Sequence, residues 1–204
     1  MGDKNHGKDY TPLLEYLDIC SVHAGYASRK LISGTMADPK KTLWLFNSGK
    51  DRFSFGFYNW RMESKGRWEW HWRWQEPESN AYNNFEWYNP FTSLDALAPA
   101  APPGEYEGAT LFKSDLLRVS AGIMDYKYLY TLENCIKKSS NTAALEAQYF
   151  LDGLKRTIGL FPKLKGIPTA DEGALLGKGM DTSLNKMTPL WRKKIVEFIA
   201  RLKN

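Results

Sequence analysis

The sequence predicts an α/β fold in which about three parallel strands are followed by a helical tail. Strand-like apolar runs occupy 16–23, 41–49 and 66–74, and helix-like stretches at 26–37 and 51–64 separate them. Strands and helices that alternate at this spacing are typical of right-handed βαβ units, whose strands are parallel. We therefore expect one parallel sheet in the first part of the chain.

The first two strands and the helix between them have clear local boundaries. YLDICSVH is rich in β-forming residues and stops at Gly25, and KTLWLFNSG closes on the turn-forming NSG. The helix at 26–37 stops before Pro39, as expected because the residue ahead of a proline is driven out of the helical conformation.

The second helix, DRFSFGFYNWRMES at 51–64, has both a cap and an apolar side. Asp51 is of the residue type that caps helix N-termini. Phe53, Phe57 and Trp60 follow at the i, i+4, i+7 spacing of a core-facing helix side.

The third strand, GRWEWHWRW at 66–74, is the most unusual stretch. Trp68, Trp70, Trp72 and Trp74 occupy every second position, so they share one side of a strand, with charged residues on the other. Indole rings fill protein cores, but they also stack on the flat apolar faces of sugars and nucleobases.

The remainder of the chain divides into an irregular region and a helical tail. Residues 76–117 are rich in Asn, aromatic residues, Pro and Ala, as in binding loops and linkers, and 109–117 is a candidate short strand.

Three further helices are predicted after this region. They lie at 117–138, at 141–159 with Asn141 as its cap, and at 188–204 with Thr188 as N-cap and Pro189 as first residue.

Bulk composition restricts the function classes. The chain has 204 residues, of which 43% are hydrophobic and 14% aromatic, and its net charge is +5. Its Lys and Arg residues are scattered, which favours a solvated surface over a nucleic-acid footprint. Cys20 and Cys135 lack metal-binding spacing, so we expect buried thiols, no metal and no cofactor. No apolar run approaches the ~20 residues of a membrane span, and no signal peptide is visible, so we expect a soluble chain without a membrane partner.

Four stretches in this order resemble a known family. YLDICSVH, KTLWLFNSG, RFSFGFYNWRMESKGRWEWHW and LLRVSAGIMDYKYLYTLE resemble the C-terminal part of (β/α)8-barrel glycoside hydrolases of family 123 and related barrel domains. The most specific match is the helix pattern R-x-x-x-G-I-x-D-Y-x-Y-L-x-x-L, which Arg118 to Leu132 fits. The resemblance implies a partial TIM-type barrel at 13–139, containing the sixth, seventh and eighth strands, and a helical extension at 140–204.

The resemblance does not bring catalytic residues with it. The resemblance implies a catalytic pair of adjacent Asp and Glu residues on an earlier strand. In such a pair one carboxylate orients the substrate's acetamido group and the other is the general acid. Asp171-Glu172 is such a pair, but it lies in a Gly-rich connection beyond the barrel. A half-barrel also exposes the edge of its sixth strand. We therefore expect that an N-terminal half-barrel or a second copy covers this edge, or that the fold closes differently.

Barrel enzymes bind substrate at the carboxyl ends of their strands. In this arrangement His23 and Asn47 are predicted to hydrogen-bond sugar hydroxyls, and Trp72 or Trp74 to form a flat platform under a sugar ring. For Trp68 and Trp70, packing within the barrel is favoured over ligand contact. The candidate substrate-binding residues are His23, Asn47, Trp70, Trp72, Arg73, Trp74 and Trp87, the last from the loop NAYNNFEWYNPFTS.

Three charged residues are predicted to be structural. Asp18 lies between Leu17 and Ile19, so it is expected inside the barrel, paired with Arg67 or Arg73. Arg118 and Asp125 are seven residues apart and share a helix face, which favours an anchor for that helix.

Three hypotheses of function follow. The first is the C-terminal part of a glycoside hydrolase-like barrel, which contributes sugar-contacting aromatic residues while catalysis lies elsewhere. The second is a non-catalytic carbohydrate-binding or scaffold module. The third, and weaker, is a basic and aromatic nucleic-acid binder.

Overall fold

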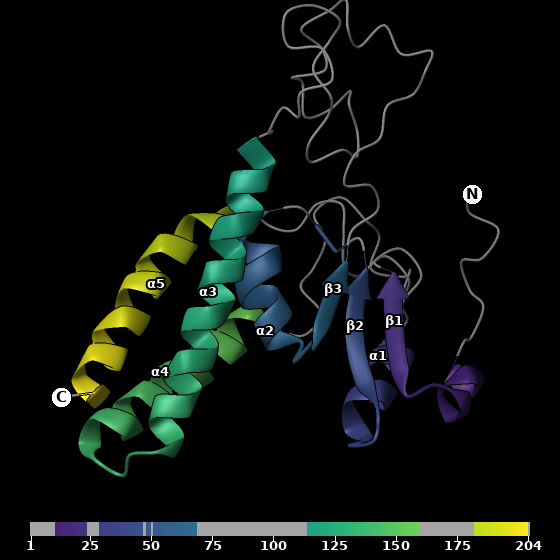
Figure 1. Cartoon of the computed structure of the whole chain (residues 1–204), viewed down its shortest axis with the longest axis horizontal. Coiled ribbons are helices and arrows are strands. Elements are labelled where there is room, and N and C mark those ends of the chain that lie inside the picture. Colours follow the sequence, from purple (N-terminus) through teal and green to yellow (C-terminus); the bar gives the residue numbers. More distant parts are fainter. Residues whose placement is uncertain are drawn as a thin grey trace, which may run out of the picture.

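A three-stranded parallel sheet lies beside a group of helices (Figure 1). The chain is mixed α/β, which confirms the fold class that the sequence predicts. Within the described ranges no helix is long and apolar enough to cross a membrane. The structure, a computed structural model, describes residues 11–23, 29–46, 48–49, 51–68, 114–159 and 182–203.

The sheet has the strand order β1-β2-β3, and both neighbouring pairs are parallel. The strands are β1 (Ile19–His23), β2 (Thr42–Phe46) and β3 (Gly66–Trp68). Their register brings the last residues of all three strands to one edge. The first predicted strand is therefore confirmed over Ile19–His23 and the second over Thr42–Phe46, and the third is described only as far as Trp68. Because the described strands form an open sheet, the partial barrel remains a proposal.

One face of the sheet is covered by helix. Side chains alternate between the two faces of a strand, and on this face Cys20, Val22, Leu43 and Leu45 are all buried. Helix α1 (Arg29–Ala37) contacts β2, and the short 3-10 helix η1 (Thr11–Tyr16) packs on α1.

The chain between β2 and β3 forms one short helical stretch. It consists of a π-helical turn, η2 (Ser54–Tyr58), and α2 (Asn59–Arg61). Asp51 Oδ1 accepts a hydrogen bond from the Ser54 amide (2.7 Å), and Ser54 Oγ accepts one from the Asp51 amide (3.2 Å). This reciprocal pair is a capping arrangement, so the predicted cap is confirmed. The three aromatic residues predicted to face the core are also buried: Phe53, Phe57 and Trp60.

The helical tail consists of three helices that pack against one another (Figure 1). They are α3 (Ser114–Lys137), α4 (Thr142–Ile158) and α5 (Thr182–Lys203). Asn141 Oδ1 accepts a hydrogen bond from the Ala144 amide (2.9 Å), which confirms the predicted cap of α4.

Two predicted boundaries are wrong. Helix α5 begins at Thr182, so Pro189 lies inside it rather than at its first position. A proline lacks the amide that would bond to the carbonyl four residues earlier, here Asn185. The Thr188 hydroxyl donates to that carbonyl instead (2.8 Å), which allows the helix to continue through the proline. The candidate strand at 109–117 is also corrected, because α3 already begins at Ser114 and the residues before it lie outside the described ranges.

The helical tail shares a hydrophobic core with the sheet. One cluster of buried side chains runs from β1 and β2 through η2 and α3 to α4 and α5. The division between a barrel part at 13–139 and an extension at 140–204 therefore remains a prediction, although α4 and α5 share this core.

The crossing of η2 and α3 depends on two glycines. A Cβ on Gly122 would lie 2.6 Å from the Arg52 carbonyl oxygen, and one on Gly56 would lie 2.8 Å from the Gly122 carbonyl oxygen. Both distances are shorter than real Cβ contacts, and the opposing atoms are backbone, which does not move easily. The two backbones are thus in direct contact.

We predict that Gly122→Ala destabilises the protein by about 1–3 kcal/mol, because the added methyl group forces the two backbones apart. The matched control is Gly153→Ala on α4, where the nearest atom to a new Cβ is a flexible arginine nitrogen at 3.9 Å. This control is expected to gain about 0.5–1 kcal/mol from helix propensity. Urea unfolding measures both free energies, and equal effects of the two variants would contradict the crossing.

A second prediction concerns Tyr58, which is completely buried. Burial raises the pKa of its hydroxyl above the ordinary value of 10.0, while Arg67 and Arg61 act in the opposite direction. Below pH 10 the hydroxyl is neutral in both states, whereas above it only the unfolded state releases the proton. The free energy of unfolding therefore falls as the pH rises past about 10.

Tyr58→Phe is expected to make this fall shallower, as measured by urea unfolding at about pH 8 and about pH 10.5. The control Tyr130→Phe, at an exposed position of α3, is expected to show the same decrease in the free energy of unfolding as the wild-type chain. If the free energy of unfolding of Tyr58→Phe decreased with pH as steeply as that of the wild type, the buried hydroxyl would not contribute to the pH dependence of stability.

Candidate functional site

The second face of the sheet is open and aromatic. Register and alternation place Trp44 and Phe46 of β2 on it together with Trp68 of β3 and Ser21 of β1. None of the described side chains on this face is charged. We call it the open face.

Trp68 is the last described residue of β3 and is held at two points. Its ring stacks on Phe46, with centroids 4.0 Å apart and planes 13° from parallel. Its indole Nε1–H donates to Ser21 Oγ across the sheet (2.8 Å). The side chain is nevertheless 46% exposed. Since Phe46 covers one side of the ring, Trp68 is a fixed aromatic surface that a ligand can reach.

Trp44 lies flat on the neighbouring strand. A Cβ on Gly66 would lie only 2.4 Å from the Trp44 ring, so the ring rests directly against the β3 backbone. Its exposed fraction is 36%. Trp44 therefore covers β3, and Trp68 extends from β3 over β2 to β1, so the two indoles together cover all three strands.

Arg67 supports this edge from the covered face. Its guanidinium donates to the carbonyl oxygens of Ser54 (2.6 Å) and Gly49, and it lies 3.8 Å from the centroid of the Phe55 ring. Arg67 thus fixes β3 to Gly49 and to Ser54 at the start of η2.

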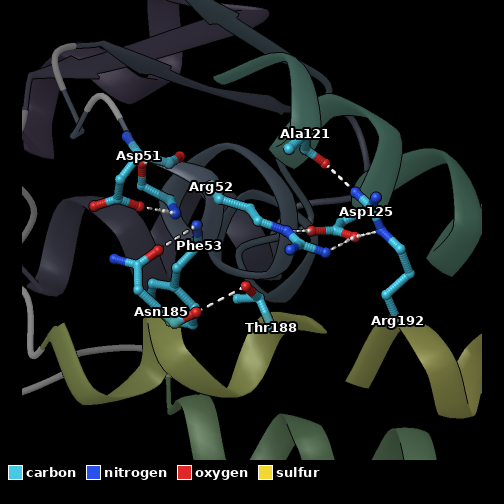
Figure 2. Close-up of polar contacts among 9 residues, drawn as sticks. Asp51, Arg52, Phe53, Ala121, Asp125, Asn185, Thr188 and Arg192 are labelled. Atoms are coloured by element: carbon cyan, nitrogen blue, oxygen red, sulfur yellow. Dashed lines mark hydrogen bonds and ion pairs between the residues drawn. The ribbon is translucent and has the colours of Figure 1, made fainter. Parts of the chain in front are cut away.

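The start of the η2 stretch is also tied to the helical tail (Figure 2). Asp125 of α3 is fully buried and accepts hydrogen bonds from Arg52 Nε (2.6 Å), Arg52 Nη2 (3.1 Å) and Arg192 Nε. Arg192 also donates to the Ala121 carbonyl. One buried carboxylate therefore joins three elements: the start of the η2 stretch, α3 and α5.

A second contact, from α5, supports the start of the η2 stretch. Asn185 Oδ1 accepts a hydrogen bond from the Phe53 amide (2.9 Å), as Figure 2 shows. An amide nitrogen in the first turn of a helix has no partner within that helix, so the α5 side chain supplies the missing acceptor.

Most predicted substrate-binding residues cannot be placed. His23 is the last residue of β1, level with Phe46 and Trp68, but its side chain lies outside the described part. The other predicted residues fall outside the described ranges altogether: Asn47, Trp70, Trp72, Arg73, Trp74 and Trp87.

The three predicted structural residues have different environments. Asp18 is exposed and precedes β1 by one residue, so the expectation that it is buried inside a barrel is corrected: the strand begins later than predicted. Asp125 is buried as an anchor of α3. Arg118, two turns earlier on α3, has an exposed side chain.

Sequence reasoning missed the residues that form the open face. It favoured packing for Trp68 and did not consider Trp44, Phe46 or Ser21 as a group. The alternation in TLWLF was the available signal, because it separates Leu43 and Leu45 from the aromatic residues.

The described residues offer little for metal or redox chemistry. They contain no group of three or more His, Cys, Asp or Glu residues that could hold a metal ion. Cys20 and Cys135 are free thiols. Asp125 is paired with the two guanidinium groups of Arg52 and Arg192.

Comparison with known proteins adds no assignment: no family model, curated protein or solved structure matches the chain.

We predict that Asp125→Asn lowers the free energy of unfolding by about 2–4 kcal/mol, because two partly buried guanidinium groups lose their counter-charge. The control is Glu197→Gln, which removes an exposed partner of Lys194 and is expected to cost less than about 0.5 kcal/mol. Thermal or urea unfolding measures both, and a loss at Asp125 as small as that of the control would contradict its anchoring role.

Proposed function

We propose that the chain is a carbohydrate-binding protein, the late part of a glycoside hydrolase-like barrel, and that sugar binds at the carboxyl edge of the open face. The observation that carries this proposal is the fixed and exposed indole of Trp68. The axial C–H groups of a pyranose ring suit the negatively polarised face of an indole. A ring already held by two contacts loses little freedom when it binds.

The position of Trp68 supports the same proposal. Ligands of parallel α/β proteins bind outside the carboxyl ends of the strands. The last described residues of the three strands, His23, Phe46 and Trp68, are level with one another in the sheet. His23 and Asn47 remain proposed donors to sugar hydroxyls at this edge, and Trp70, Trp72, Arg73, Trp74 and Trp87 its proposed continuation.

Binding rather than catalysis is the activity that we assign to this chain. The adjacent Asp-Glu pair that the resemblance calls for has no counterpart on the three strands. If the barrel is completed by other strands, the acid and the nucleophile-orienting carboxylate belong to them. If it is not, the chain is a binding or scaffold module.

A nucleic-acid ligand is less well supported. Stacking on single-stranded bases is normally combined with a positively charged groove, and the described side chains of the open face carry no charge.

We predict that oligosaccharides, N-acetylated ones included, quench the tryptophan fluorescence of the chain in a saturable way. Trp68→Ala is expected to weaken this binding by about 5- to 150-fold, if the ring contributes the roughly 1–3 kcal/mol that an aromatic side chain contributes when it stacks on a nucleobase. Ser21→Ala is expected to weaken it less, because the ring stays in place but is no longer fixed at its indole nitrogen.

The matched control is Tyr130→Ala, which removes an exposed aromatic ring on α3 and is expected to leave binding unchanged. A chromogenic glycoside distinguishes an active hydrolase from a binding module. Absence of binding across the oligosaccharides, or equal binding by the Trp68 variant, would overturn the proposal. Salt-sensitive binding of single-stranded nucleic acid in their place would favour the third hypothesis.

A further inference from the structure

We propose that a cavity between α3 and α4 binds a free acidic α-amino acid, with Glu133 as the acceptor for its ammonium group. The cavity has a volume of about 170 Å³. An engineered cavity of about 150 Å³ holds benzene, so this one fits a ligand of roughly ten non-hydrogen atoms or fewer. None of its lining residues belongs to the sheet, so it is separate from the open face: Glu133, Ile136, Lys137, Gln148, Leu151 and Lys155.

Glu133 is fixed in the wall of the cavity by a buried indole. Trp60 of α2 is 5% exposed, and its Nε1–H donates a hydrogen bond to Glu133 Oε1 (2.9 Å). Within the described residues the second carboxylate oxygen of Glu133 has no hydrogen bond. An ionised carboxylate has about four acceptor positions. Glu133 is therefore oriented by one contact and can still accept hydrogen bonds from an ammonium group.

Lys155 places a positive charge on the α4 wall of the same cavity. Its backbone carbonyl accepts a hydrogen bond from Arg61 Nε (2.8 Å), and its ammonium nitrogen lies 5.4 Å from the centroid of the Trp60 ring. Cations at this distance from an indole are attracted to the ring. The same indole thus contacts the carboxylate of α3 and the ammonium group of α4.

The opposite charges of the cavity line it without pairing with each other. No ion pair joins Glu133 to Lys155, or to Lys137 one turn later on α3, in the part of the chain that the structure describes. Opposite charges that share a cavity without direct contact are complementary to a ligand that carries both signs. In an α-amino acid the ammonium group suits Glu133, and the α-carboxylate suits Lys155.

The second lysine indicates the side chain of the ligand. Glu133 is the one negatively charged residue of the lining, whereas Lys137 and Lys155 are positively charged. A ligand with one ammonium group and two carboxylates, such as L-glutamate, matches all three charges. The methylene groups of its side chain suit the apolar residues of the lining, Ile136 and Leu151.

Two further carboxylates lie near the cavity but outside its lining. Asp152 accepts a hydrogen bond from Gln148 Nε2 (2.9 Å), and a carboxylate oxygen of Glu63 lies 4.0 Å from the Lys155 ammonium nitrogen. The Glu63 side chain is 63% exposed, so this long ion pair is weak. Both carboxylates oppose every anionic ligand alike, so they lower the affinity without changing the order of the ligands.

The test is a titration of the full chain with L-glutamate at constant ionic strength, followed through the indole N–H resonance of Trp60. A saturable shift with a dissociation constant of millimolar order or tighter is expected. L-Leucine is expected to bind more weakly, because it lacks the second carboxylate. Glutarate is the matched control ligand, since it keeps both carboxylates and lacks the ammonium group. Its binding is expected to be at least about tenfold weaker than that of L-glutamate.

Glu133→Gln tests the acceptor directly. The amide oxygen can still accept from Trp60, but the negative charge is lost, so L-glutamate is expected to bind at least about tenfold more weakly and to lose its advantage over glutarate. The matched control is Glu146→Gln on α4, which removes the same charge from an exposed ion pair with Arg201 (2.8 Å) and is expected to leave binding unchanged.

Circular dichroism and a cooperative urea transition establish that each variant is folded. If Glu133→Gln does not fold, Lys155→Gln replaces it and is expected to weaken the binding of L-glutamate and glutarate alike. The absence of a saturable shift at about 50 mM L-glutamate overturns the proposal. Equal affinities for L-glutamate and glutarate also overturn it, as does a loss in Glu146→Gln as large as that in Glu133→Gln.

The outcome is independent of carbohydrate binding, because different indoles report on the two sites. L-Glutamate is expected to shift the resonance of Trp60 and to leave that of Trp68 unchanged. A chain that binds oligosaccharide at Trp68 but no amino acid overturns the cavity site alone, whereas the reverse result overturns the proposed function alone.

Discussion

The contact between η2 and α3 is the constraint on which the rest of the described structure depends. Gly56 and Gly122 allow the two backbones to touch, and Asp125 lies at the same crossing between Arg52 and Arg192. The carboxylate is fully buried, so its cost of desolvation is offset only because two guanidinium groups and three hydrogen bonds surround it. The geometry of the crossing and the charge pairing therefore require each other.

This contact also explains how a sheet with an open face keeps its shape. The η2 stretch is fixed to α3 and α5 through Arg52 and Phe53. Arg67 fixes β3 to the Ser54 carbonyl at the start of η2 and to the Gly49 carbonyl before it. The sheet is thereby held from its covered side. Its other face is free to present Trp44 and Trp68, which are supported by the sheet itself through Gly66, Phe46 and Ser21.

The sequence predicts the elements well because their signals are local. The Asp51 and Asn141 caps and the buried Phe53 and Phe57 depend on neighbours a few residues away, and all are confirmed. The partners of Asp125 lie 73 residues before it and 67 after it, so no spacing could reveal them. No local pattern indicates that the Trp44 ring lies against Gly66, a contact that follows from the pairing of β2 with β3. These roles depend on contacts between segments that are far apart in the chain, and local spacing in a single sequence does not reveal such contacts.

The central claim is that the open face is a ligand-binding surface on a scaffold held by the crossing of η2 and α3. The most direct measurement follows the indole N–H resonances of the chain by NMR during titration with an oligosaccharide. The account predicts a saturable shift at Trp68, whose side chain is exposed, and no shift at Trp60, whose side chain is buried and whose indole N–H donates a hydrogen bond to Glu133. An unmoved Trp68 resonance, or equal shifts at both indoles, would contradict it.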